Sequence, residues 1–205
     1  MEPGPVPMRF ADGGRAEVPA IGLGTWELEG ETCVRSILSS VEAGYRHFDT
    51  ARAYENEREV GKGLAASGLD RSQYWLTSKA WFEDLSPGSI RSQAEESLSQ
   101  LGVDYLDLFL IHWPNEDDPL EETLQEMTKL VREQKIRFFG VSNFTPDQWA
   151  TALGIAPAII TNQVEYHPFL DQHELLEMAG AHGAFITAYS PLASGMAFKA
   201  ESETL

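Results

Sequence analysis

The chain has 205 residues, of which 42% are hydrophobic and 23% charged, which is ample for a buried core and fits one domain over residues 1–205. Its 32 acidic and 15 basic residues give a formal net charge of −17, so we expect no nucleic acid and no membrane as partner, because both repel an acidic surface. The single cysteine, Cys33, excludes an intrachain disulfide and favours a reducing, cytoplasmic setting.

The first 18 residues predict a tail followed by a small hairpin. Residues 1–7 are acidic and rich in proline, which is the wrong chemistry for an export signal, and they predict a loose tail. Residues 10–18 have Asp12, Gly13 and Gly14 near their middle, a pattern that favours a hairpin. We expect the main body of the fold to occupy residues 19–205.

In that main body, apolar strands alternate with helical patterns. Residues 20–26 predict a short strand, and Thr32 is placed to cap a helix whose apolar residues recur at i, i+3, i+4 and i+7. Later helices have their own start signals: Ser86 before a proline, a capping box that begins at Thr145, and Asp171. The strands between the helices are predicted to end at polar or aromatic residues, which are Asp49, Lys79, His112, Ser142, Gln163 and Tyr189.

The strand-helix units repeat every 20 to 35 residues, roughly, which is the period of an α/β fold of the (β/α)8 TIM-barrel type. A doubly wound sheet is the alternative. It is disfavoured because no Gly-x-Gly-x-x-Gly turn follows the first strand and because the strand ends are suited to one shared site. Seven strands can be counted before Leu205, whereas such a barrel has eight, so we expect the last helix-strand-helix to be missing.

An acid and a tyrosine lie on either side of the loop that follows the second strand. Asp49 ends that strand and Tyr54 comes just after it, which is typical of a proton-transfer site. A tyrosine phenol has an ordinary pKa of about 10, and a nearby cation favours release of its proton. Lys79 at the end of the next strand can supply that cation, with Asp49 holding the ammonium in place. Tyr54 is therefore the candidate general acid, the alternative being a tyrosine that only packs.

His112 follows the most apolar predicted strand and precedes Trp113. A lone histidine is most often a satisfied core residue, but this position favours a residue of the site. A neutral imidazole can donate one hydrogen bond to a substrate carbonyl and orient it. No pair among the five histidines has metal-ligand spacing with acids nearby, so we expect no metal.

Five motifs follow one another at compatible spacing. They are Gly-Tyr-Arg-His-Phe-Asp-Thr-Ala with Tyr-Glu-Asn-Glu from Gly44 to Glu57, Thr-Ser-Lys79, Leu-Ile-His112-Trp-Pro, Gly-Val-Ser-Asn143-Phe, and Asn-Gln163-Val-Glu-Tyr-His-Pro. Together they resemble the aldo-keto reductase family, most closely its bacterial branch that includes the diketogluconate reductases. The resemblance runs from about residue 19 to residue 195.

The resemblance implies an oxidoreductase that reduces aldehydes or ketones to alcohols by hydride transfer from NADPH, with NADH as the alternative cofactor. Asp49, Lys79 and His112 would assist Tyr54, and a small carbonyl compound would be the partner. Because the chain stops at Leu205, the family's C-terminal part, with much of its adenosine-phosphate site, is expected to be absent. A truncated, inactive fragment and a non-catalytic, cofactor-binding member are the alternative functions.

The resemblance also implies binding roles. The cofactor would be held by Thr25, Trp26, Asp49, Ser142, Asn143, Gln163, Tyr189, Ser190 and Leu192. Among them the amides and Ser142 would bond the nicotinamide carboxamide, and Tyr189 would stack on its ring. The substrate pocket would be formed by Trp26, Trp81, His112 and Trp113. The alternative roles are strand-end capping for the amides and core packing for the aromatic residues.

Overall fold

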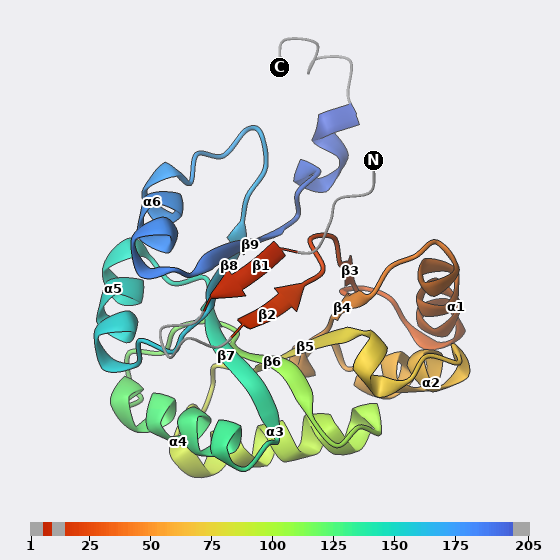
Figure 1. Cartoon of the computed structure of the whole chain (residues 1–205), viewed down its shortest axis with the longest axis horizontal. Helices are drawn as coiled ribbons and strands as arrows, with labels where there is room; N and C mark the ends of the chain where they lie inside the picture. Colours follow the sequence, from red (N-terminus) through yellow and green to blue (C-terminus); the bar gives the residue numbers. More distant parts are fainter. Residues whose placement is uncertain (1–5, 10–14, 199–205) are drawn as a thin grey trace.

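A parallel sheet of seven strands forms the centre of the computed structural model, which describes residues 6–9 and 15–198. The strands are hydrogen-bonded in the same order as they occur in the sequence, and they curve into a nearly closed barrel (Figure 1). They are β3 (Leu23–Gly24), β4 (His47–Asp49), β5 (Trp75–Ala80), β6 (Leu106–Ile111), β7 (Ile136–Ser142), β8 (Thr161–Glu165) and β9 (Phe185–Tyr189). A doubly wound sheet reverses its strand order at a switch point, so the sequential order excludes that alternative.

In the described part of the chain, six helices cover the outside of the sheet (Figure 1). They are α1 (Gly30–Glu42), α2 (Glu57–Ala66), α3 (Pro87–Leu101), α4 (Leu120–Arg132), α5 (Pro146–Ile155) and α6 (His173–His182). The described residues also form short 3₁₀ helices, namely η1 (Arg52–Tyr54), η2 (Arg71–Gln73) and η3 (Ala193–Phe198). Every residue of β5 and β6 is buried, because the helices cover one face of these strands and the barrel interior covers the other.

A two-stranded antiparallel hairpin, β1 (Val6–Arg9) and β2 (Arg15–Val18), lies across one end of the barrel (Figure 1). Val18 is buried against the interior residues Trp75, Leu108 and Leu110. The hairpin was predicted over residues 10–18 and begins earlier, because Val6 pairs with Val18; residues 6 and 7, predicted in the tail, are part of β1. The predictions for residues 1–5 and 10–14 lie outside the described residues.

Some predicted boundaries are corrected by the backbone hydrogen bonds. The first long helix begins at Gly30, not after a Thr32 cap, because the N–H groups of Thr32 and Cys33 already bond to the Glu29 carbonyl. The strand predicted over residues 20–26 is only two residues long, because only these two pair with β4. The capping box at Thr145 is confirmed.

The strands β3 and β9 lie at the two ends of the hydrogen-bonded order. Within residues 6–9 and 15–198, no further strand pairs with their outer edges. The chain after β9 is described only as far as residue 198, where η3 ends. None of the helices in the described part of the chain combines the length and apolar character that a membrane crossing requires.

Candidate active site

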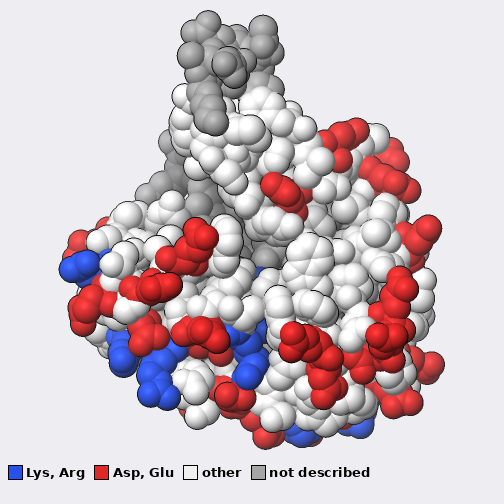
Figure 2. Space-filling view, turned by 180° about the vertical axis from the view of Figure 1, so that it is seen from behind, with Lys and Arg blue, Asp and Glu red and all other residues white. Residues whose placement is uncertain are grey.

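The carboxyl ends of β4 and β5 bring an acid, a lysine and a tyrosine together. Asp49 is the last residue of β4, Lys79 is near the end of β5, and Tyr54 ends the η1 turn that follows β4. Because side chains alternate along a strand, Trp75 and Lys79 both point into the barrel, with Trp75 at the hairpin end. The cluster therefore lies at the barrel end opposite the hairpin. Figure 2 views that side, where mostly uncharged side chains surround a hollow and acidic side chains are spread over the surface around it.

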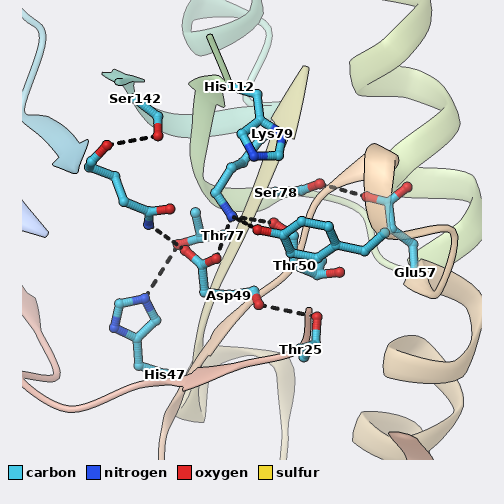
Figure 3. A network of polar contacts seen from close by, with 12 residues as sticks. Thr25, His47, Asp49, Thr50, Glu57, Thr77, Ser78, Lys79, His112 and Ser142 are labelled. Atoms are coloured by element: carbon cyan, nitrogen blue, oxygen red, sulfur yellow. Dashed lines mark hydrogen bonds and ion pairs between the residues drawn. The ribbon is translucent and has the colours of Figure 1, made fainter. Parts of the chain in front are cut away.

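The ammonium of Lys79 is wholly buried and has three acceptors around it. It donates to Asp49 Oδ1, to the Thr50 carbonyl at 2.9 Å and to the Tyr54 hydroxyl at 3.3 Å (Figure 3). A lysine ammonium is only a donor, so the Tyr54 oxygen accepts in this contact. The hydroxyl hydrogen of Tyr54 thus stays available for donation to another group.

Two opposing influences set the charge of Lys79. Burial alone lowers its pKa, but the Asp49 carboxylate and the Tyr54 oxygen outweigh burial and raise the pKa above its ordinary value of 10.5. Asp49 is fixed in turn, because Gln163 Nε2 donates to its second oxygen at 2.7 Å. The lysine is therefore a fixed positive charge beside the Tyr54 hydroxyl at neutral pH.

His112 lies directly after β6 and is 8% exposed. Its ring packs edge-on against Tyr54 and Trp81, with centroid distances of 5.7 and 5.5 Å. Burial, together with the positive charge of Lys79, lowers the pKa of His112 to about 4, so the ring is neutral at pH 7. Its buried Nδ1 has no hydrogen-bond partner in the described residues, and we assign the hydrogen to Nε2, since this tautomer buries no unpaired N–H. Nε2 is then a hydrogen-bond donor.

The lowered pKa of His112 predicts a pH dependence of stability. The unfolded chain takes up a proton near the ordinary pKa of 6.5 and the folded protein only near 4, so the unfolded state binds more protons between these values. The free energy of unfolding should be fully maintained above pH 6.5 and should fall by about 3 kcal/mol through this group as the pH drops to 4. Urea unfolding of wild type and His112→Gln across this range measures the effect. The variant should lose less stability on acidification, and equal slopes would contradict the assignment.

A second set of contacts links β7, β8 and β9 to this cluster. The Tyr189 hydroxyl donates to Asn143 Oδ1 at 2.9 Å, and Asn143 Nδ2 donates to the His112 carbonyl at 3.0 Å. Burial and the nearby Glu165 carboxylate raise the pKa of Tyr189, which keeps this hydroxyl protonated. Ser142 Oγ donates to the carbonyl of Gln163 at 2.7 Å. All four predicted cofactor residues of these strands therefore lie at one end of the barrel, in contact with the Asp49 and His112 region.

The remaining predicted residues are less closely grouped. Thr25 has no exposed surface, and its hydroxyl donates to the backbone carbonyl of Asp49. It therefore helps to hold the Asp49 backbone in place. Among the tryptophans, Trp81 is half-buried against His112, while Trp26 and Trp113 are 66% and 43% exposed. Ser190 and Leu192 lie in the loop after β9. In the described part of the chain, no three His, Cys, Asp or Glu side chains are grouped as a metal site would require.

An open cavity of about 670 Å³ lies between the loops that follow β8 and β9. Its walls are Tyr166, His167, Pro168, Phe169, Leu170, Asp171 and Pro191. None of these residues belongs to the Asp49, Lys79 and Tyr54 cluster. We place the candidate chemistry at the cluster, because the convergent charged and polar groups are there.

Sequence reasoning missed three buried polar residues around the cluster: Thr50, Asn56 and Glu57. Asn56 bonds to Thr50 and to two carbonyls of the β3–α1 loop. Glu57 accepts from Ser78 Oγ at 2.6 Å, and burial raises its pKa (Figure 3). The available signal was their place in two motifs: Thr50 directly follows Asp49, and Asn56 and Glu57 belong to the Tyr-Glu-Asn-Glu motif where α2 begins.

Comparison with known proteins assigns the family. The family model described as "Aldo/keto reductase family" matches residues 20–205. The chain belongs to the aldo/keto reductase family. The methylglyoxal reductase DkgB of Salmonella typhi is 40% identical over 188 residues, covering 90% of this chain and 70% of that protein.

Solved structures of this aldo/keto reductase family have the same fold. A structure proposed to be a 2,5-diketo-D-gluconic acid reductase B superposes with a TM-score of 0.86 at 36% identity, over 93% of this chain and 68% of that chain. An aldo-keto reductase of Bombyx mori in complex with NADP has a TM-score of 0.81 at 31% identity, over 92% and 67%. These matches confirm the predicted TIM-barrel type and the predicted kinship with the diketogluconate reductases.

This aldo/keto reductase chain spans 65% of the length of the aldo-keto reductase of Mycobacterium sp. (strain KMS), 70% of that of the Salmonella typhi protein and 61% of that of a Schizosaccharomyces pombe oxidoreductase.

Proposed function

We propose that this protein reduces aldehydes or ketones to alcohols with a nicotinamide dinucleotide, for which NADPH is the expected form and NADH the alternative. One observation carries the proposal: the Tyr54 hydroxyl accepts a hydrogen bond from the charged ammonium of Lys79, which leaves its own hydrogen for donation. A proton donor beside a fixed cation is what reduction of a carbonyl group requires.

The protein's own groups would act on the carbonyl oxygen. When bound, the nicotinamide supplies a hydride to the carbonyl carbon. Tyr54 gives its proton to the oxygen, so the C=O double bond becomes an alcohol, and the phenolate that remains is stabilised by Lys79. Asp49 keeps Lys79 charged and in place, and His112 donates from Nε2 to orient the carbonyl.

The residues at the ends of β7 to β9 suit a carboxamide and an aromatic ring. Gln163 uses one Nε2 hydrogen on Asp49, and in the described residues its other hydrogen and its Oε1 take part in no hydrogen bond. A nicotinamide carboxamide has one acceptor and two donor hydrogens and can pair with these atoms. The half-buried ring of Tyr189 offers a stacking surface beside them. The NADP complex of the Bombyx mori relative supports this choice of cofactor.

Thermal unfolding with and without NADPH, followed by turnover assays, tests the proposal. A ligand that binds only the folded state stabilises it by about 2.7 kcal/mol at a hundred times its dissociation constant, so the melting temperature should rise. Loss of NADPH absorbance is then measured with methylglyoxal, the substrate named for the Salmonella typhi relative, and with a panel of aldehydes and ketones. A melting temperature that changes with neither NADPH nor NADH would contradict the proposed cofactor site. A raised melting temperature without turnover of any carbonyl compound would contradict the proposed reductase function.

A further inference from the structure

Asn56 is a buried amide, 2% exposed, that joins three segments of the chain. Its Nδ2 donates to the carbonyls of Thr25 and Leu28 at 2.7 and 2.9 Å, and its Oδ1 accepts from the Thr50 hydroxyl at 2.9 Å. Both amide hydrogens and the amide oxygen are therefore used. The side chain ties the start of α2 to the β3–α1 loop and to the residue that follows β4.

The bond to Thr50 leads directly to Lys79. Thr50 has no exposed surface, and its carbonyl accepts from the Lys79 ammonium at 2.9 Å (Figure 3). One residue thus holds Asn56 with its side chain and Lys79 with its backbone. A shift of Thr50 would move one of the three acceptors that surround the ammonium.

Asn56 is linked to Tyr54 on its other side by a strained turn. The residue between them, Glu55, has φ 53° and ψ 22°, in the left-handed region that costs a non-glycine residue about 1 kcal/mol. Such a conformation persists where the surrounding structure holds it in place. Glu55 itself is exposed, so its neighbours must hold the turn in this conformation. We assign that role to the hydrogen bonds of the buried Asn56 side chain.

We propose that Asn56 is a positioning residue that fixes the Tyr54 hydroxyl against the Lys79 ammonium, acting through the Glu55 turn on one side and through Thr50 on the other. The effect on turnover rests on the proposed reductase function, whereas the effect on the geometry of Lys79 does not. The start of α2 keeps a second anchor without Asn56, because Glu57 bonds to Ser78 independently. The fold is therefore expected to survive replacement of Asn56.

Two substitutions and a matched control test the proposal. Asn56→Ala removes all three bonds, and Thr50→Val removes only the hydroxyl that reaches Asn56. Thr123→Val is the control, because Thr123 is also buried at 1% exposure and its hydroxyl donates to the carbonyls of Leu85 and Pro119, away from the cluster. A displacement of catalytic groups by about 1 Å can cost 100-fold in rate, so kcat should fall about 10- to 100-fold in the first two variants, with the NADPH dissociation constant unchanged.

A second measurement does not depend on activity. Lys79 is wholly buried under its three acceptors, and loosening them should expose it to acetic anhydride. Peptide mass spectrometry should find faster acetylation of Lys79 in Asn56→Ala and Thr50→Val than in wild type and Thr123→Val. Amide hydrogens of β6 should stay protected from exchange in all four proteins, which shows that global unfolding is not the cause.

The outcomes separate the two proposals. If wild type reduces no carbonyl compound, the proposed function fails, and Lys79 acetylation alone decides the role of Asn56. In an active enzyme, a lower kcat together with faster Lys79 acetylation supports the positioning role. A change in only one of these readouts, or values for Asn56→Ala that match Thr123→Val, overturns it.

Discussion

Replacing Tyr54 with phenylalanine is expected to lower kcat about 100- to 10,000-fold, the usual contribution of a general acid, while NADPH binding stays intact. The substitution removes the hydroxyl that accepts from Lys79 and keeps the ring that packs edge-on against His112. Without that hydroxyl, no proton donor is fixed beside the ammonium. NADPH oxidation at saturating carbonyl substrate measures kcat, and the NADPH-induced rise in melting temperature reports cofactor binding.

Tyr105→Phe is the matched control for Tyr54→Phe. Tyr105 precedes β6 at the opposite end of the barrel, where the Arg71 guanidinium lies 3.9 Å from its ring centroid. Removal of its hydroxyl keeps this stacked contact and should leave kcat unchanged. Wild-type turnover by Tyr54→Phe would contradict the proposed mechanism, and an equal loss in both variants would attribute the effect to folding.

The elements predicted best are those whose local signals agree with their burial. The most apolar predicted strand, which leads to His112, is present as β6, because a continuous apolar run is typical of a strand covered on both faces. The predictions failed where distant pairing decides the structure. Val6 joins a strand because Val18 lies opposite it, and the first strand of the barrel is short because only Leu23 and Gly24 pair with β4.

The site shows the same division. Asp49 and Lys79 could be predicted to meet, since each lies at or near the carboxyl end of a strand of one parallel sheet. Asn56 could not be given a role, because its partners Thr25 and Leu28 lie in another loop, and burial of an uncharged amide leaves no periodic pattern in the sequence. Which tryptophans face the site depends on loop conformation, which composition does not encode.

Asp49→Ala is expected to lower the free energy of unfolding by about 3 to 5 kcal/mol, because it leaves the ammonium of Lys79 buried without its charge partner. Lys79 has no exposed side-chain surface, whereas the Asp49 side chain is 16% exposed. Urea unfolding measures the loss. Lys79→Met should cost less, since Asp49 keeps the bond from Gln163 and some contact with water.

The double variant separates the lost pair from a general packing defect. Asp49→Ala combined with Lys79→Met contains no buried charge at this position, so it should be more stable than Asp49→Ala alone. Glu96→Ala is the control for an exposed ion pair, because Arg52 and Glu96 have 26% and 51% exposed side chains; it should cost at most about 1 kcal/mol. A double variant as unstable as the sum of both single variants would contradict an energetic coupling between Asp49 and Lys79.

The pH dependence of unfolding gives the sharpest test, because its sign reverses. In wild type the folded pKa of Lys79 lies above 10.5, so the stability contributed by the pair is fully present below pH 10.5 and is lost as the pH rises through the raised value. In Asp49→Ala, burial acts on Lys79 without the carboxylate and lowers its folded pKa. Between this lowered folded pKa and pH 10.5, Lys79 is protonated in the unfolded chain but not in the folded protein. The free energy of unfolding of Asp49→Ala therefore rises with pH in this range, whereas that of wild type does not rise through Lys79. Urea unfolding of both proteins from pH 7 to 10 should therefore bring Asp49→Ala closer to wild type at alkaline pH, and a constant difference would refute a buried, charged Lys79.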